Sequence, residues 1–520
     1  MTMTLHKLTA GDGYEYLTRQ VAAADSTELG RQALADYYSE KGERPGVWLG
    51  RGLDGVKGVS EGEQVDAAQM KALGGYMAQR VTDILDVRSR IVAQLTGQPA
   101  PGIPESETEF VLVAEDLAPA DTATLDPAKV IALVTSEGGP QAHTAILARD
   151  LGLPAIVAAN GALEIPNGTT VYVDATDGTV VTTPGEKEYR LAQAYANRKP
   201  LPEFDGTGKL ADGTQIPLYS NVGNGKAAQT AAEAKAEGIG LFRTEFAFLN
   251  RDEEPSVEEQ TVEYKTVFDA FPGRHIVVRT LDAGADKPLP FLTDTSEPNP
   301  ALGVRGYRTD WTSPGVLQRQ IEALAAAAKD STADVWAMAP MISTAPEAHD
   351  FSAMLEEAGL KTHGVMVETP SAAVTSRDIL HEVDFVSMGT NDLTQYTMAA
   401  DRLLGPLAEL TNPWQPGVLR MIDLTVRGAR QAEEETGKAK SVSVCGEAAA
   451  DPALAVVLVG LGVNALSMNT RSIPAVAAVL KSVTLEKAQQ IAVQVLDARS
   501  AENAKDVARA ELPVLDELGL

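Results

Sequence analysis

Cysteine and positive charge are the two features this sequence has little of. It holds one cysteine, Cys445, in 520 residues, which excludes an internal disulfide and any metal site built from several cysteines. It has 44 Lys and Arg residues against 72 Asp and Glu residues, for a formal net charge of −28. Such an acidic surface makes nucleic acid an unfavourable partner, and a small anionic substrate would need a locally basic pocket.

Long apolar runs are also missing. No stretch of about 18 apolar residues is present, and the N-terminus lacks the charged, apolar and small-residue pattern of an export signal. We therefore expect a cytoplasmic protein with no membrane partner. The apolar content of 44% is ordinary for a globular chain, and the length leaves room for roughly three domains.

The N-terminal stretch concentrates four of the twelve tyrosines, Tyr14, Tyr16, Tyr37 and Tyr38. It resembles the N-terminus of conjugative relaxases of the relaxase–helicase type, in which tyrosines at such positions attack a DNA phosphodiester. That chemistry also needs histidines that hold a divalent metal, and the next histidine after His6 is His143. A tyrosine without the metal has little means of reaction, so we expect an inert fragment.

Composition and periodicity predict an α/β chain with several parts. Residues 76–95 have apolar positions at helical spacing, and residues 97–104, rich in Gly and Pro, indicate a linker. Short apolar runs then alternate with short helical segments, as in a small α/β domain. The expected divisions are an N-terminal fragment (1–75), a remnant helix (76–97), the small α/β domain (98–184), a linker helix and linker (185–213) and a C-terminal domain (214–520).

One histidine of the small domain lies in a setting that suits phosphoryl chemistry. The strand-like run Val130–Val134 leads into Gly138 and Gly139, then into His143 and a helical segment. Paired glycines allow a sharp turn, and the free N–H groups at a helix start favour an anion. An imidazole beside a phosphate site is suited to accept a phosphoryl group. The alternative is a structural histidine at a strand–turn–helix junction.

The C-terminal domain alternates β-type runs with helical stretches. The eight runs are Ile216–Asn221, Gly238–Phe242, His275–Arg279, Val335–Met341, Gly364–Glu368, Phe385–Met388, Ser441–Cys445 and Ala465–Met468. Eight β/α units over about 300 residues predict a (β/α)₈ barrel, whose active site lies at the C-terminal ends of the strands.

Charged residues follow several of these runs. Four arginines stand at or after strand ends, namely Arg243, Arg279, Arg305 and Arg402. Arginines that converge in an acidic protein favour a small anion with phosphate and carboxylate groups. Glu368 and Asp392 follow adjacent strands and suit Mg²⁺. Taken singly, each arginine could form a surface ion pair, Glu368 could cap a helix, and Cys445 could be buried packing.

Five motifs carry a family resemblance. They are GGPQAHT at 138–144, GLFRTEF at 240–246, NPALGVR at 299–305, MGTNDLTQY at 388–396 and VCGE at 444–447. From about Tyr76 onward the chain resembles Enzyme I of the phosphoenolpyruvate-dependent sugar phosphotransferase system. The resemblance implies a swivelling phosphohistidine domain, a phosphoenolpyruvate-binding (β/α)₈ barrel, a homodimer formed through the barrel, and the carrier protein HPr as the next phosphoryl acceptor.

The same resemblance implies residue roles. His143 would accept the phosphoryl group from phosphoenolpyruvate on Nε2, and Cys445 would protonate the resulting enolate. Glu368 and Asp392 would bind Mg²⁺. The substrate would be held by Arg243, Arg279, Arg305, Lys287, Asn391 and Arg402. Transfer to a neutral imidazole is mostly a matter of positioning and charge neutralisation, which these groups supply.

The chain departs from the family pattern at its start. Enzyme I begins with a strand of the histidine domain and a helical domain that docks HPr, and here the relaxase-like fragment stands in their place. We expect phosphoenolpyruvate and Mg²⁺ binding to be kept and transfer to HPr to be severely impaired. Two alternatives stay open: a truncated fusion that binds phosphoenolpyruvate without completing transfer, and a relative of pyruvate phosphate dikinase or phosphoenolpyruvate synthase, whose ATP-binding domain would not fit into residues 1–75.

Overall fold

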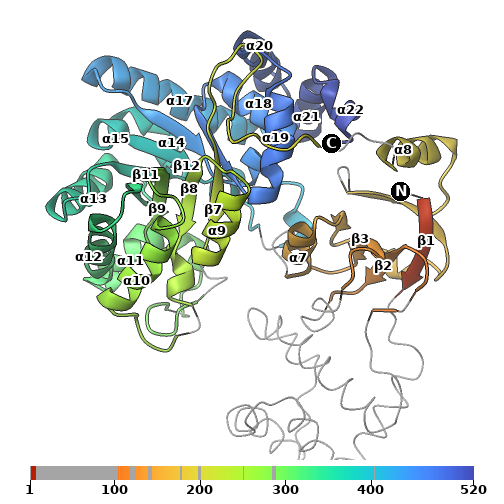
Figure 1. Cartoon of the computed structure of the whole chain (residues 1–520), viewed down its shortest axis with the longest axis horizontal. Coiled ribbons are helices and arrows are strands. Elements are labelled where there is room, and N and C mark those ends of the chain that lie inside the picture. The colour runs from red at the N-terminus through yellow and green to blue at the C-terminus, as the bar shows by residue number, and fades with distance from the viewer. Residues whose placement is uncertain are drawn as a thin grey trace, which may run out of the picture. The chain divides into compact units, whose positions relative to one another are not determined.

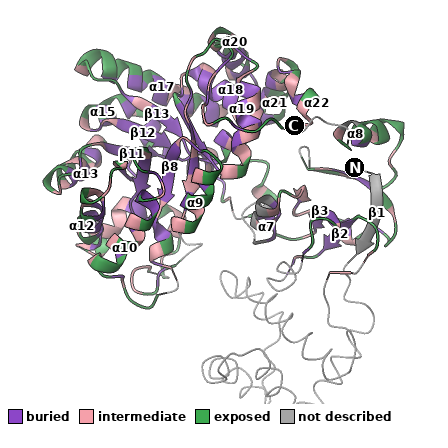
Figure 2. Ribbon diagram, in the orientation of Figure 1, coloured by how far each residue is buried: buried purple, intermediate pink, exposed green. Residues whose placement is uncertain are grey.

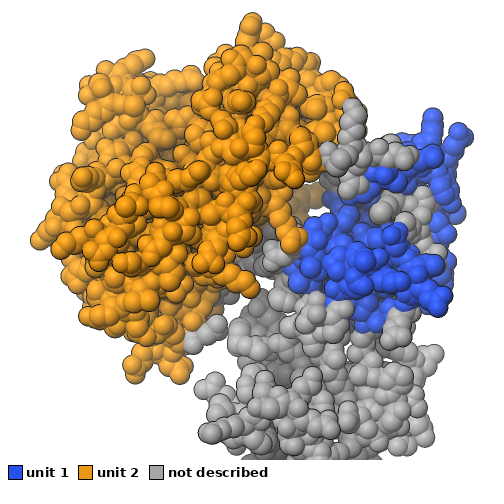
Figure 3. Space-filling model, in the orientation of Figure 1, with its two compact units in different colours: residues 1–197 blue, residues 198–520 orange. Residues whose placement is uncertain are grey.

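The computed structural model describes residues 2–7, 103–104, 106–117, 125–138, 143–175, 178–196, 201–249, 251–283, 288–294, 296–402 and 404–520. The tyrosines of the relaxase-like stretch, the helix predicted at 76–97 and Lys287 lie outside these residues. The chain divides into two units, residues 1–197 and residues 198–520 (Figure 3).

The first unit is built on a mixed six-stranded sheet of order β4-β3-β2-β1-β5-β6 (Figure 1). Strands β1 to β4 are parallel where they pair, while β5 is antiparallel to both β1 and β6. The strands are β1 Thr2–Lys7, β2 Phe110–Ala114, β3 Val130–Thr135, β4 Ala155–Ile156, β5 Thr170–Asp174 and β6 Thr179–Val181. The helices are α7 His143–Leu151, the 3₁₀ turn η1 Ala162–Glu164 and α8 Glu186–Ala196.

Strands β2 and β3 are buried along their whole length, as expected of near-continuous apolar runs in a parallel sheet covered on both faces. Alternate residues of these strands serve two separate cores. Val111 and Val113 pack with Val171 and Val173 of β5 in one core, and Phe110 and its neighbours pack with Ala148 of α7 in the other. The sheet therefore positions α7, the helix that begins at His143.

The second unit is a closed barrel of eight strands, every neighbouring pair of which is parallel. The strands are β7 Leu218–Val222, β8 Gly238–Arg243, β9 His275–Arg279, β10 Asp334–Ala339, β11 His363–Val367, β12 Phe385–Met388, β13 Ser441–Val444 and β14 Ala465–Met468. They follow one another around the ring in chain order. The predicted (β/α)₈ barrel is confirmed, with strand ends shifted by at most a few residues.

Helices surround the ring on the outside (Figure 1). They are α9 Gly225–Glu233, α10 Val257–Phe268, α11 Thr309–Thr312, α12 Val316–Lys329, α13 Ala345–Glu357, α14 Pro370–Val374, α15 Ser376–Glu382, α16 Thr390–Met398, α17 Pro416–Thr436, α18 Pro452–Leu461, α19 Ile473–Leu480, α20 Leu485–Leu496, α21 Ala501–Ala510 and α22 Val514–Leu518. The 3₁₀ turns are η2 Thr244–Ala247, η3 Pro300–Leu302, η4 Gly306–Arg308, η5 Gly405–Leu407, η6 Glu447–Ala450 and η7 Thr470–Ser472.

Two apolar layers hold the barrel together. The larger core lies between strands and helices, where much of the ribbon is coloured as buried (Figure 2). A smaller cluster of Leu241, Val277, Met338, Met366 and Phe385 comes from the strands themselves and includes Cys445. Across the described residues, no helix combines the length and apolar character needed to cross a membrane.

Candidate functional site

The C-terminal ends of the barrel strands carry the predicted polar groups, and parallel strands bring these ends to one rim. Arg243 and Arg279 are the last residues of β8 and β9. Glu368 directly follows β11 and Cys445 directly follows β13. In each case a charged or polar residue stands where a largely buried strand reaches the rim.

Arg305 and Arg402 reach the same rim from loops and meet Asp392 there. Nη1 of Arg305 lies 3.0 Å from Oδ1 of Asp392, and Nη1 of Arg402 lies 3.8 Å from its Oδ2. Asp392 belongs to the first turn of α16, the helix that follows β12. Three of the predicted residues therefore meet in one cluster of ion pairs.

Asp282 and Glu245 extend this cluster, and the sequence analysis gave neither a role. Asp282 accepts two hydrogen bonds from Arg305, from Nε at 3.1 Å and from Nη2 at 2.8 Å, and it also pairs with Arg279 at 3.2 Å. Nη2 of Arg279 donates to Oε1 of Glu245 at 3.0 Å. The signal available in the sequence was an acidic residue within three positions of a strand-end arginine.

Most charged groups of the cluster are buried, and each of its guanidinium groups is paired with a carboxylate. Burial disfavours the charge on Asp282, but Arg305 and Arg279 outweigh burial and hold its pKa below the usual range. Burial also disfavours the charge on Arg279, and Glu245 and Asp282 reverse that effect and raise its pKa. Both arginines therefore stay charged and have fixed partners.

Arg243 differs from the other three arginines. Its side chain is half-buried, and no ion pair or hydrogen bond joins it to any part of the chain that the structure describes. Its charge lies close enough to Cys445 to affect that thiol. Of the four rim arginines, Arg243 is the one whose guanidinium is available to an external anion.

Glu368 is buried at the rim, and the pKa of its carboxyl group is raised. Its Oε1 accepts a hydrogen bond from the backbone N–H of Met341 at 2.6 Å, whereas Oε2 is buried and has no partner. Burial, together with the like charges of Asp392 and Asp282, raises the pKa of Glu368 to about 8. A buried carboxylate oxygen without a partner is the kind of group that a cation satisfies.

Glu368 and Asp392 together fit Mg²⁺, which binds to one or two protein carboxylates and takes its other ligands from water and substrate phosphate. The unpartnered Oε2 of Glu368 supports that fit. Within the described ranges, no group of three or more His, Cys, Asp or Glu residues converges as a closed metal site would require. The donor set therefore suits a weakly held, hydrated cation.

Cys445 is buried at the mouth of the barrel. Its Sγ lies 3.6 Å from the carbonyl oxygen of Met388, and Asn221 donates to the Cys445 carbonyl at 2.9 Å. Burial raises the pKa of the Cys445 thiol, so the group carries its proton at neutral pH. Asn391 contacts the segment after Cys445, where its Oδ1 accepts a hydrogen bond from the backbone N–H of Glu447 at 3.2 Å.

His143 is the first residue of α7 in the other unit, and its side chain lies outside the described part. The start of α7 is fixed by the next residue, because Oγ1 of Thr144 donates to Oδ1 of Asp116 at 2.5 Å. The same Oγ1 accepts the backbone N–H of Leu117. Gly138, three residues after β3, has φ 85, a conformation that favours glycine.

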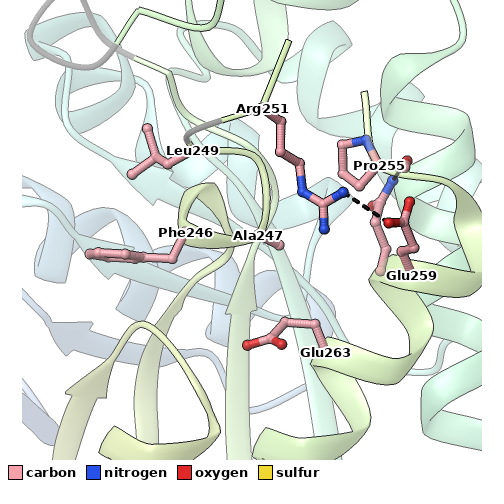
Figure 4. Close-up of a pocket in the computed structure, with 8 residues that line it drawn as sticks. Phe246, Ala247, Leu249, Arg251, Pro255, Glu259 and Glu263 are labelled. Carbon is pink, nitrogen blue, oxygen red and sulfur yellow. Dashed lines mark hydrogen bonds and ion pairs between the residues drawn. The ribbon is translucent and has the colours of Figure 1, made fainter. Parts of the chain in front are cut away.

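A surface cavity of about 270 Å³ lies beyond η2, the turn that follows Arg243, and contains none of the predicted site residues (Figure 4). Its main polar contact is the ion pair between Arg251 and Glu259 at 2.9 Å. Because Glu259 and Glu263 line it and Arg251 is already paired, the cavity is a poor site for an anion.

Comparisons with known proteins agree with this geometry. The model of the PEP-utilising enzyme, PEP-binding domain, matches residues 204–485, and that of the PEP-utilising enzyme, mobile domain, matches residues 106–178. A TrwC relaxase model matches residues 10–112. The relaxase resemblance is thereby confirmed and reaches beyond residue 75, into β2.

Among full-length relatives, a phosphoenolpyruvate-protein phosphotransferase of Streptomyces coelicolor is 50% identical over 86% of this chain and 80% of its own length. One of Haloferax volcanii is 39% identical over 86% of this chain and 80% of its own length. The solved structure titled "NMR solution structure of Enzyme I (nEIt) protein" is 35% identical and covers 25% of this chain and 55% of its own, but its TM-score of 0.20 carries no argument about fold.

The fold and site define a PEP-utilising enzyme with a mobile domain. The chain belongs to the phosphoenolpyruvate-protein phosphotransferase family. The expectation of a phosphotransferase enzyme of the Enzyme I type is thus confirmed.

Proposed function

We propose that this protein takes the phosphoryl group of phosphoenolpyruvate onto His143. One observation carries the proposal: Arg243, Arg279, Arg305 and Arg402 converge at one rim of a barrel in a chain of net charge −28. Three of these guanidinium groups already have carboxylate partners, so Arg243 is the one left to bind an external anion. The free guanidinium of Arg243 makes the first contact with the phosphate, and Asn391 and Lys287 assist.

In the proposed reaction, the P–O bond of phosphoenolpyruvate breaks and a P–N bond forms to Nε2 of His143. The arginines orient the phosphoryl group and offset its charge. The electron pair left on the departing oxygen gives the pyruvate enolate, and the proton on Sγ of Cys445 goes to its methylene carbon. Transfer requires that the two units meet during the reaction cycle.

Glu368 and Asp392 would hold Mg²⁺, which supplies positive charge opposite the phosphate when bound. HPr is the proposed acceptor from phosphorylated His143. We expect transfer to HPr to be severely impaired, because the relaxase-like stretch replaces most of the segment expected to dock it. The match of the relaxase model to residues 10–112 supports that expectation.

The test is labelling with phosphoenolpyruvate that carries radioactive phosphate. We expect acid-labile label on the wild-type chain with Mg²⁺, little with EDTA, and none on His143→Ala. His349→Ala is the matched control, because His349 is an exposed histidine on α13 that pairs with Glu382 at 2.8 Å. Absence of label on the wild type would contradict the proposal.

The same experiment separates the alternatives. Binding of phosphoenolpyruvate in calorimetry without any label would leave a truncated fusion that binds and does not transfer. Label from the γ-phosphate of ATP would indicate a relative of the dikinase group. Addition of HPr to the labelled chain measures the second transfer, and we expect the label to stay on His143.

A homodimer through the barrel and a cytoplasmic location complete the proposal. Leu302 and Trp311, in the segment between β9 and α12, are 70% and 61% exposed. Large exposed apolar side chains favour an interface. Sedimentation of the wild type and of a Leu302→Ser, Trp311→Ser double variant tests this, and we expect the variant to be monomeric.

A further inference from the structure

The strand β1 lies in the middle of the small sheet although residues 8–109 separate it from β2, the next strand along the chain (Figure 1). The sequence analysis had assigned these first residues to the relaxase-like fragment. The match of the relaxase model begins only at residue 10, after β1 has ended. Strand β1 therefore comes from residues before the relaxase match, and it belongs to the sheet of the first unit.

The pairing of β1 is divided between two partners of opposite direction. Thr2–Thr4 pair antiparallel with Thr170–Tyr172 of β5, and Leu5–Lys7 pair parallel with Val111–Val113 of β2. In the described sheet, β1 is the only strand that joins the parallel strands β4-β3-β2 to the hairpin β5-β6.

The position of β1, between β2 and β5 in the sheet, would be costly to leave unfilled. Strands lie about 4.8 Å apart in a sheet, so its removal would leave a gap of roughly 10 Å between β2 and β5. Val111, Val113 and Val171, which flank this gap, are each 0% exposed. Backbone N–H and C=O groups left unpaired between two apolar layers cost free energy comparable to lost hydrogen bonds.

We propose that the space between β2 and β5 is a binding site for an extended strand, recognised through its main chain, and that residues 2–7 fill it without needing their covalent link to the domain. Recognition by main-chain pairing is the mode in which an added strand completes a sheet. Residues 8–109 separate β1 from β2 in the sequence, so no short turn fixes the register of β1. The proposal does not depend on the catalytic function.

A consequence concerns His143. Helix α7, which begins at His143, packs through Ala148 onto the face of the sheet formed by Phe110 and Leu112 of β2. Helix α7 thus rests on β2, a strand that pairs with β3 along one edge and with β1 along the other. The first residues of the chain therefore contribute a strand to the sheet that supports α7.

The test is to insert a protease site after Thr9 in the full chain, cut it, and follow the fragment of residues 1–9. We expect the fragment to co-elute with the rest of the protein under native conditions and to leave in urea. Hydrogen exchange of the amides of Val111, Val113 and Val171 should be unchanged after the cut, then at least tenfold faster once the fragment is removed. A synthetic peptide of residues 1–9 should restore protection, and a scrambled peptide should not.

Point variants of the uncut chain provide a second measurement. Leu5→Pro removes a backbone N–H within the register with β2 and should speed exchange at Val111 and Val113, whereas Thr9→Pro, two residues past β1, should not. Amides of β9 in the barrel unit serve as an internal reference. Release of the fragment on cutting with no change in exchange, or equal exchange in Leu5→Pro and wild type, would overturn the proposal.

Discussion

Replacing Asp282 by Asn would separate the positioning of the rim arginines from the binding of the substrate. Asp282 is 6% exposed, and both of its oxygens are occupied by guanidinium groups, with Arg305 at 2.8 and 3.1 Å and Arg279 at 3.2 Å. Asn keeps the shape of the side chain, but its amide presents N–H donors to guanidinium donors. Among the residues that the structure describes, Arg279 is then left with its ion pair to Glu245, and Arg305 with its ion pair to Asp392.

The expected cost follows from the burial of the pair. Removing one partner of a buried ion pair costs about 3–5 kcal/mol, since the other charge is left uncompensated. Arginines that have lost their fixed orientation should lower the rate of phosphoryl transfer by roughly 10²-fold. Removal of a negative charge leaves the rim more positive, so the phosphoenolpyruvate concentration that gives half-maximal rate should not rise.

Single-turnover labelling of His143 at several phosphoenolpyruvate concentrations measures both quantities. Urea unfolding followed by tryptophan fluorescence measures stability, because Trp311, Trp336 and Trp414 all lie in the barrel unit. Glu254→Gln is the control: its ion pair with Arg319 at 2.6 Å is on the surface and should contribute less than about 1 kcal/mol. An unchanged rate with a tenfold rise in the half-saturating concentration would refute a positioning role for Asp282.

Three further predictions concern the same rim. Burial and the charge of Asp392 raise the pKa of Glu368 from an ordinary 4.5 to about 8. In EDTA and between these two pH values, the native state therefore holds a proton that the unfolded state releases. Stability should therefore be full below pH 4.5 and fall as pH rises towards 8, by up to about 1.4 kcal/mol per pH unit, and urea midpoints of Glu368→Gln should lack this slope. A Cβ at Gly446 would lie 1.9 Å from Oγ1 of Thr390, whereas one at Gly417 would meet nothing closer than 3.4 Å. Gly446→Ala should therefore lower the free energy of unfolding by about 1–3 kcal/mol. Equal stability of Gly446→Ala and the control Gly417→Ala would contradict the crowding argument. Burial raises the pKa of the Cys445 thiol, so the native chain should react with an aromatic disulfide reagent at pH 7 far more slowly than the urea-unfolded chain, and rapid native reaction would show the thiol to be accessible.

The barrel could be predicted because its signal is local. Most strands are short runs rich in apolar residues, as parallel strands covered on both sides require, and β12 and β14 have the predicted ends. Arg243 and Arg279 were predictable for a related reason, since each is the last residue of a strand. Arg305 and Arg402 lie farther from a strand end, and their roles were implied by the family resemblance. The convergence of the four follows from the closed ring.

The acidic partners could not be predicted in the same way. Which carboxylate meets which guanidinium depends on the loop that returns Arg305 to Asp282, 23 positions earlier in the chain. Strand β1 was missed for a stronger reason: its pairing with β2 spans about 100 residues, and no local pattern encodes a contact at that separation.

The balance of charge at the rim bears on how a substrate anion could enter. Arg279, Arg305 and Arg402 face the carboxylates of Glu245, Asp282 and Asp392, so these three guanidinium groups are already compensated. Such buried pairs add little net stability, because desolvation offsets their attraction, and the apolar layers around the strands supply the stability of the barrel. Under the proposed function, a phosphate that approaches free Arg243 can recruit Arg305 only as Arg305 releases Asp392. The carboxylate released in that exchange is one of the two that suit Mg²⁺, so substrate and metal should each strengthen the binding of the other.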